Sequence, residues 1–192
     1  MKIEKISADK YLNKTAFLKA FKDALKPRLR LSVSEFTEKH IFLPSNSAMP
    51  GLINLSITPY LRQILDDLTP YNGVQFVVFV SSVQIAKSTA GICFIMSNMV
   101  LDPSNSMVVL PRHSDAEDFS TERITPMLKA SPIYQDVIDV EQKSSENKVG
   151  KKTYKGGFIY FTGAGSASAL KSKPIKNILM DEVDEYQRDL QG

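Results

Sequence analysis

The sequence has very little cysteine, no tryptophan and no long apolar run, and these absences exclude several classes of protein. Of 192 residues only one is cysteine, so a disulfide within the chain is excluded. That residue, Cys93, stands in an apolar stretch and is predicted to be a small core residue rather than a nucleophile. No apolar stretch approaches the roughly 20 residues that span a bilayer, and the charged first segment has no apolar signal-peptide core. We therefore expect a cytoplasmic protein with no membrane partner.

A formal net charge of +3 is mild, so charge alone does not indicate a nucleic-acid partner. Apolar runs at 74–80, 106–110, 158–162 and 177–180 are predicted strands, and helical patterns separate the earlier ones. Strands that alternate with helices favour a parallel sheet with both faces covered. The lysine-rich stretch 141–157 is predicted to be a hairpin or an exposed excursion before the third strand.

The N-terminal part is predicted to be helical and separate from the sheet. Residues 14–26 place four apolar side chains on one helical face. Ser32 and Glu35 have capping-box spacing, which predicts a second helix. In 58–68 we expect a third helix, capped by Thr58 with Pro59 in its first turn. We place the boundary in the Pro- and Gly-containing loop between the second and third helices, which gives a helical region 1–45 and a main domain 46–192.

The stretch SSVQIAKST, residues 81–89, has the setting of a phosphate-binding loop because it lies between a predicted strand and a helix. The pattern reads Ser81, four residues, Ala86, Lys87 and Ser88, so both expected glycines are absent. In such loops backbone N–H groups wrap the phosphates, the lysine adds a charge and the hydroxyl holds Mg²⁺. The alternative is a plain surface turn.

Two carboxylates follow the last predicted strand. Asp181 and Glu182 end the segment KNILMDE, and the carboxyl end of a parallel strand faces the ligand crevice of an open α/β sheet. In this position Asp181 would hold Mg²⁺ through water, and Glu182 would polarise the water that attacks the γ-phosphate of ATP. The alternative is an acidic cap on a following helix. Both motifs together predict an ATPase site.

Several strings in this order resemble the ATPase region of the large terminase subunit of lambda-type tailed phages. They are FLPSNSAMPGLI, TPYLRQILDDL, FVSSVQIAKST, DPSNSMVVLPRHSDAEDFSTERITPML and GGFIYFTGAGSASALKSKPIKNILMDEVDEY. The resemblance implies a P-loop NTPase-type three-layer α/β sandwich that hydrolyses ATP with Mg²⁺. It further implies a motor that moves double-stranded viral DNA into a procapsid through the portal, works with the small terminase subunit in the bacterial host's cytoplasm, and is joined to a nuclease.

The resemblance also implies roles for individual residues. Lys87 and Ser88 match the lysine and hydroxyl of the loop, and Asp181 and Glu182 match the metal-binding and catalytic carboxylates; Lys87 is counted with Glu182 as catalytic. Tyr60 matches the segment used near adenine, although a core tyrosine is the alternative. The predicted nucleotide-binding residues are Tyr60, Ser82, Gln84, Ile85, Ala86, Lys87, Ser88 and Thr89.

Basic residues are the candidates for DNA contact. Arg123 is expected to face phosphate or DNA, with a solvated helix arginine as the alternative. Five lysines flank the third predicted strand and the glycine-rich loop GAG, residues 163–165, that follows it. They are expected to contact DNA phosphates without reading the base sequence. The alternative is that they serve only solubility. They are Lys151, Lys152, Lys155, Lys171 and Lys173.

The chain departs from the family pattern in its loop and in its length. If the backbone at Ala86 needs a positive φ, alanine costs about 1 kcal/mol there relative to glycine. Ser81 replaces a basic residue whose charge would stabilise the transition state, so turnover should suffer more than binding. The chain ends at Gly192, ten residues after Glu182, which predicts an N-terminal fragment without the nuclease. The alternatives are an impaired prophage remnant or assembly module that binds the small subunit, and a helicase-like translocase.

Overall fold

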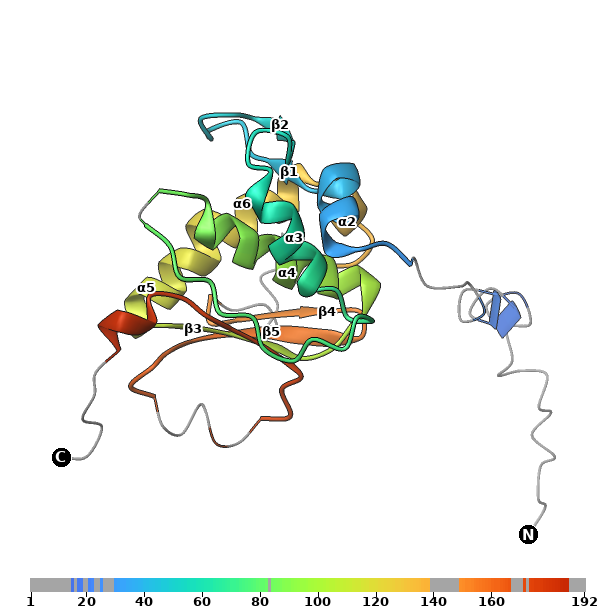
Figure 1. Cartoon of the computed structure of the whole chain (residues 1–192). Helices are drawn as coiled ribbons and strands as arrows, with labels where there is room; N and C mark the ends of the chain where they lie inside the picture. The colour runs from blue at the N-terminus through green and yellow to red at the C-terminus, as the bar shows by residue number, and fades with distance from the viewer. Residues whose placement is uncertain are drawn as a thin grey trace, which may run out of the picture.

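The computed structural model describes residues 30–82, 84–138, 149–166 and 173–186. It also describes a few further positions, namely 15, 17, 18, 21, 22, 25 and 171. Its helices and strands alternate along much of this range (Figure 1). The helices are α2 (Val33–His40), α3 (Tyr60–Asp67), α4 (Lys87–Leu101), α5 (His113–Asp118) and α6 (Thr125–Ala130), with a π-helix (Phe119–Ile124) joining the last two and short 3-10 helices at Pro132–Tyr134 and Val183–Glu185. The strands are β1 (Phe42–Leu43), β2 (Gly51–Leu52), β3 (Ser106–Leu110), β4 (Lys151–Tyr154), β5 (Gly157–Gly163) and β6 (Asn177–Met180).

The main sheet is mixed and has the strand order β4-β5-β3-β6. β3 pairs in parallel with both β5 and β6, while β4 pairs antiparallel with β5. The predicted strands at 106–110, 158–162 and 177–180 are thus confirmed, and two of the three pairings are parallel as expected. The end of the stretch 141–157, predicted as a hairpin or exposed excursion before the third strand, instead forms β4, which pairs with the third predicted strand itself through a turn at Gly156 with φ of +99°. Residues 139–148 lie outside the described residues, so the rest of that prediction stays untested.

The prediction of a first strand at 74–80 is wrong. This segment belongs to no helix and has no strand pairing, and Figure 1 shows it as a plain trace between α3 and α4. Only Phe79 packs against the core, whereas Phe76 and Val80 are 87% and 89% exposed. The apolar run predicted a strand buried on both sides, but this segment buries only one side.

The helices cover one face of the main sheet, as Figure 1 shows. Successive side chains of a strand point to opposite faces, so Val108, Ile159 and Phe161 join the large core under the helices. Met107 and Val109 point the other way and belong to a much smaller cluster with Ala164. No helix covers this second face in the described part of the chain. The α/β class is therefore established, while the third layer of the predicted sandwich stays a prediction.

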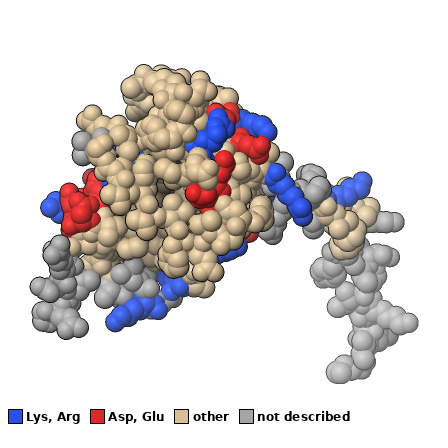
Figure 2. Space-filling view, in the orientation of Figure 1, with Lys and Arg blue, Asp and Glu red and all other residues tan. Residues whose placement is uncertain are grey.

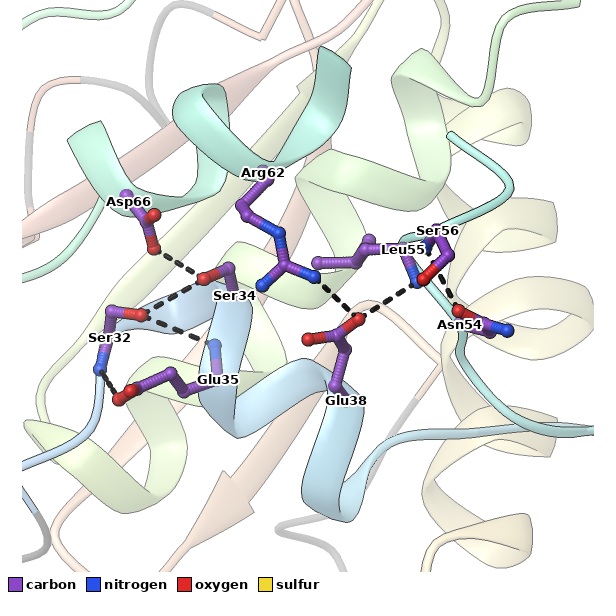
Figure 3. A network of polar contacts seen from close by, with 9 residues as sticks. All are labelled: Ser32, Ser34, Glu35, Glu38, Asn54, Leu55, Ser56, Arg62 and Asp66. Atoms are coloured by element: carbon purple, nitrogen blue, oxygen red, sulfur yellow. Dashed lines mark hydrogen bonds and ion pairs between the residues drawn. The ribbon is translucent and has the colours of Figure 1, made fainter. Parts of the chain in front are cut away.

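The predicted capping box at the start of α2 is confirmed. Ser32 accepts a hydrogen bond from the Glu35 backbone N–H, and the Glu35 carboxylate accepts one from the Ser32 N–H (Figure 3). At α3 the prediction was wrong in detail, because Pro59 is the N-cap residue and no side chain caps the helix. Thr58 instead contributes its carbonyl oxygen, which accepts a hydrogen bond from the Leu61 N–H.

Polar side chains fasten α2 to α3 and to the segment before it (Figure 3). Arg62 of α3 pairs with Glu38 of α2 at 2.8 Å, and the same Glu38 oxygen accepts a hydrogen bond from the Leu55 N–H. Val33 and Phe36 of α2 are fully buried in the core that contains α4. The core therefore continues across residue 45, and the division into regions 1–45 and 46–192 stays a prediction.

Of the predicted helix 14–26, only isolated positions are described. Residues 15, 17, 18, 21 and 22 are helical, and the rest of the stretch lies outside the described residues. The rings of Phe17 and Phe21 stack with centroids 6.2 Å apart, which is the contact expected for helical neighbours at i and i+4. Across the described residues, no helix combines the length and hydropathy needed to cross a bilayer.

Candidate functional site

The loop before α4 has a strained backbone. Ala86 is the N-cap residue of α4 with φ 59° and ψ 25°, and Gln84 also has a positive φ of 61°. This is the left-handed region, where an L-residue with a β-carbon costs roughly 1–2 kcal/mol. The condition stated for Ala86 from the sequence is thus met. Strain of this kind clusters at functional sites, where the surrounding structure enforces it.

Lys87, Ser88 and Asp181 meet at the carboxyl end of β6. Lys87 Nζ lies 3.1 Å from Asp181 Oδ1, and Ser88 Oγ donates a hydrogen bond of 2.7 Å to Asp181 Oδ2. The hydrogen bond to Asp181 raises the pKa of Lys87 above its ordinary value, and the charges of Asp181 and Glu182 add to this. The two motifs predicted to share a site are therefore in direct contact.

Strand geometry and one glycine explain this contact. Asp181 follows Leu179 by two residues, so its side chain falls on the helix-covered face of the sheet. A β-carbon on Gly91 of α4 would come within 2.8 Å of Leu179 Cδ1. Glycine at this position therefore lets the first turns of α4, which carry Lys87 and Ser88, lie close to β6.

Asp181 is 6% exposed and accepts three hydrogen-bonding contacts. Besides Lys87 and Ser88, the backbone N–H of Glu182 donates to Asp181 Oδ1 at 3.0 Å. Glu182 itself adopts a left-handed conformation with φ 55° and caps the following 3-10 helix without a side-chain hydrogen bond. Glu182 thus occupies the N-cap position of this short helix, so the alternative of an acidic helix cap stays open for Glu182, while Asp181 is held by Lys87 and Ser88.

A cleft of about 250 Å³ opens beside these residues. Its wall combines the ends of β3 and β6 with the helical segment after β3. The lining residues are Ser88, Leu110, Asp115, Asp118, Phe119, Glu122, Arg123, Asp181 and Glu182. Acidic side chains gather at the side of the molecule where α5 lies, as Figure 2 shows.

The acidic residues of the helical segment were missed by the sequence analysis. Asp115, Asp118 and Glu122 are spaced i, i+3, i+7, which predicts one shared face of an α-helix, and all three line the cleft. They follow β3, whose carboxyl end lies at the same edge of the sheet as that of β6 because the two strands are parallel. The signal in the sequence that could have identified these residues is their spacing directly after a predicted parallel strand.

Tyr60 lies against the phosphate-binding loop. Its hydroxyl donates a hydrogen bond of 3.1 Å to the carbonyl oxygen of Ile85, and its side chain is 47% exposed. The alternative of a core tyrosine is therefore wrong. Of the other predicted loop residues, Ser82 and Gln84 are exposed and Thr89 is half-buried.

The five candidate DNA-binding lysines do not form one strip. Lys151 of β4 lies opposite Tyr160 of β5 in the strand register, on the face without helices. The ammonium group of Lys173 lies over the Tyr160 ring. Lys152 pairs with the buried Ile159 on the opposite face, where burial lowers its pKa. Lys155 and Lys171 are exposed.

The oxygen atoms at the site suit a magnesium ion. Mg²⁺ usually takes one or two protein oxygens and fills its remaining positions with water and substrate phosphates. The Ser88 hydroxyl and the Asp181 carboxylate, 2.7 Å apart, are donors of this kind. Within the described ranges there is no cluster of three or more His, Cys, Asp or Glu side chains that would form an all-protein metal site.

One comparison with known proteins gave a result. The model of a family described as phage terminase large subunit gpA, ATPase domain, matches residues 47–192. No curated protein and no solved structure gives a match. The matched range includes the strained loop, α4, the cleft residues and both carboxylates at the end of β6.

Proposed function

The chain belongs to the ATPase-domain family of phage terminase large subunits, and we propose that it binds ATP with Mg²⁺ and hydrolyses it to drive viral DNA into a procapsid. The observation that carries this proposal is the contact of Lys87 and Ser88 with Asp181. A lysine and a hydroxyl from a helix N-terminus, held against a carboxylate at a strand end, are the groups that an ATP·Mg site requires. The three-layer P-loop sandwich is part of the same proposal.

The residues have distinct roles in this mechanism. Bound Mg²⁺ would neutralise charge on the phosphates, with Ser88 and Asp181 as its protein-side ligands. With Mg²⁺ held by Ser88 and Asp181, Lys87 Nζ would be free to pair with the β- and γ-phosphate oxygens of ATP. Glu182 orients a water molecule and accepts its proton as the water oxygen bonds to the γ-phosphorus. The bond from that phosphorus to the bridging oxygen breaks, and its electron pair stays on ADP.

The loop residues position the nucleotide. Tyr60 offers an exposed ring beside the loop for stacking on adenine. The backbone N–H groups of Ser82, Gln84, Ile85 and Ala86, with the side chain of Thr89, complete the phosphate cradle. Because Ala86 is strained and Ser81 is uncharged, turnover is low while binding is retained.

The experiment is a titration of the full chain with a fluorescent ATP analogue and Mg²⁺. Lys87→Ala should weaken binding at least about tenfold, because a charge-assisted contact to phosphate is lost. Lys155→Ala is the matched control, since this lysine is exposed on a turn away from the cleft. Equal affinity of the two variants would contradict the proposal.

The low turnover is tested separately. A chain with Ala86→Gly and Ser81→Lys should hydrolyse ATP faster than the natural chain at saturating nucleotide, because the strain is relieved and the transition state gains a charge. Steady-state phosphate release is the measurement, and affinity is measured in parallel. Equal rates would show that these substitutions are harmless.

DNA contact is proposed through the phosphate backbone. One group of basic side chains lies on the lower side of the molecule in Figure 2, while others lie next to acidic side chains elsewhere on this view. Lys151, Lys155, Lys171 and Lys173 are the exposed or half-exposed candidates, and Lys152 contributes from the other face. Affinity for duplex DNA should fall steeply with salt and be independent of sequence. Affinity that stays constant as salt rises would contradict this role.

A second candidate function is an assembly module that binds the small terminase subunit. Its supporting observation is that Phe17, Leu18 and Phe21 are exposed large apolar side chains with helical spacing. The portal of the procapsid and the cytoplasm of the bacterial host belong to the first proposal, the packaging motor. Loss of small-subunit binding on Phe21→Ser, with nucleotide affinity unchanged, would support it.

A further inference from the structure

Arg123 lines the cleft beside the phosphate-binding loop and has no charged partner there. It shares the cleft wall with Ser88, Asp181 and Glu182. Its guanidinium takes part in none of the ion pairs or side-chain hydrogen bonds found among the described residues. From the sequence, this residue is expected to face phosphate or DNA, with a solvated helix arginine as the alternative. Its position in the cleft distinguishes it from Lys151 and Lys152, which lie on β4 and do not line the cleft.

The π-helix directs Arg123 into the cleft. In a continuous α-helix, at about 100° per residue, Arg123 would lie about 80° around the axis from Asp115 of the cleft wall. The π-helix Phe119–Ile124 has wider turns with i to i+5 hydrogen bonding, so each residue rotates less and Arg123 returns toward the cleft face. Buried Phe119 and Ile124 anchor this segment at both ends. Single π turns are frequent at functional sites.

Charge explains why an unpaired arginine matters in this cleft. Five carboxylates line it, and Arg123 is the one basic residue among the lining residues. Lys87 is not among the lining residues, although it contacts Asp181, which is. A polyphosphate entering the cleft therefore meets excess negative charge unless cations offset it. A guanidinium suits this task because its planar N–H groups bind two phosphate oxygens at once.

We propose that Arg123 contacts the terminal phosphate of ATP and supplies the positive charge that Ser81 does not provide at the start of the loop. This inference rests on the proposed function, because it requires ATP in this cleft. ADP lacks the contacted phosphate, so Arg123 makes the site discriminate ATP from ADP. It also stabilises the charge that develops on the phosphate oxygens during hydrolysis.

The test compares the affinities of Mg²⁺-bound ATP analogue and ADP in the full chain. Arg123→Gln should weaken binding of the ATP analogue by about tenfold to a hundredfold and leave ADP affinity within about twofold, because one charge-assisted contact is removed. Arg123→Lys should restore part of the difference through its charge alone. Arg112→Gln is the matched control, since this exposed arginine precedes α5 and does not line the cleft.

Each outcome has a defined meaning. An unchanged ATP to ADP ratio in Arg123→Gln would overturn the inference, as would a loss of duplex-DNA affinity without a change in that ratio. A general structural effect would lower both nucleotide affinities and the melting temperature together, and this outcome would also overturn it. If the unmodified chain shows no nucleotide binding that depends on Lys87, the proposed function itself fails and this inference fails with it.

Discussion

The two faces of the main sheet are made by the same strands but have opposite surroundings. On one face Ile159 and Phe161 are fully buried under the helices. On the other face, Ile178 and Met180 of β6 are about half exposed, and Tyr186 is among the few groups that pack on it in the described part of the chain. The candidate site lies where the covered face ends, because Asp181 continues the buried side of β6.

This difference indicates a division of tasks within the sheet. The covered face contains most of the described buried apolar side chains and thus most of the stabilising burial. It also fixes α4 against β6, which holds Lys87 and Ser88 at Asp181. The second face and the segment 74–80 present apolar side chains to solvent and so contribute less to this burial.

The largest expected effect compares two isoleucines, one on each face. Ile159→Ala should lower the free energy of unfolding by about 2–5 kcal/mol, since it leaves a cavity in the covered core. Ile178→Ala should change it by less than about 1 kcal/mol, because this side chain is 55% exposed. Urea unfolding followed by circular dichroism measures both. Equal losses would show that the two faces contribute alike.

A smaller effect with opposite signs is expected at the start of α4. Ala86→Gly should raise the free energy of unfolding by about 1 kcal/mol, because glycine adopts the left-handed conformation without strain. Ala90→Gly, one turn later in the helix, should lower it by about 1 kcal/mol or more, since glycine is unfavourable within a helix. The same urea experiment compares the two variants. A loss of stability in both would contradict the strain assigned to Ala86.

The open face should respond to alkaline pH through Tyr186. Its hydroxyl donates a hydrogen bond to the Val109 carbonyl at 2.8 Å, and burial raises its pKa to about 12, with the charge of Asp181 contributing. Because the pKa of Tyr186 is higher in the folded than in the unfolded chain, the neutral hydroxyl contributes to stability. This contribution is complete below the pKa of tyrosine in the unfolded chain, near 10, and it is lost as the pH rises through 12.

The check is the pH dependence of unfolding in the natural chain and in Tyr186→Phe. Between pH 10 and 12 the natural chain should lose more stability than the variant, because phenylalanine does not ionise. Parallel pH profiles for the two proteins would contradict the assignment.

The smallest expected effect is at Cys93, beneath the covered face. The thiol is 1% exposed and burial raises its pKa to about 12, which leaves almost no reactive thiolate at neutral pH. A thiol reagent should therefore leave the folded chain unlabelled and react promptly in urea. Rapid labelling without denaturant would show that the covered face opens easily.

Much of the fold was predictable because its signals are local. The apolar runs located β3, β5 and β6, and the spacing of Ser32 and Glu35 identified the start of α2. The pairing of Lys87 with Asp181 was predictable as well, because parallel strands end at one edge of the sheet. The roles of these residues in binding and hydrolysis remain predictions.

By itself the sequence determined which segments are apolar, where the capping box of α2 lies and which polar residues follow the strands. These features depend only on residues that are near one another in the chain. Only the tertiary structure decided that 74–80 is left unpaired, that Ala86 is left-handed, and that Asp115, Glu122 and Arg123 share a cleft with Asp181. The physical reason is that an apolar run shows that burial is favourable but not which partner provides it. Hydrogen-bond partners, the rotation of a π turn and the convergence of charges depend on contacts between residues far apart in the chain.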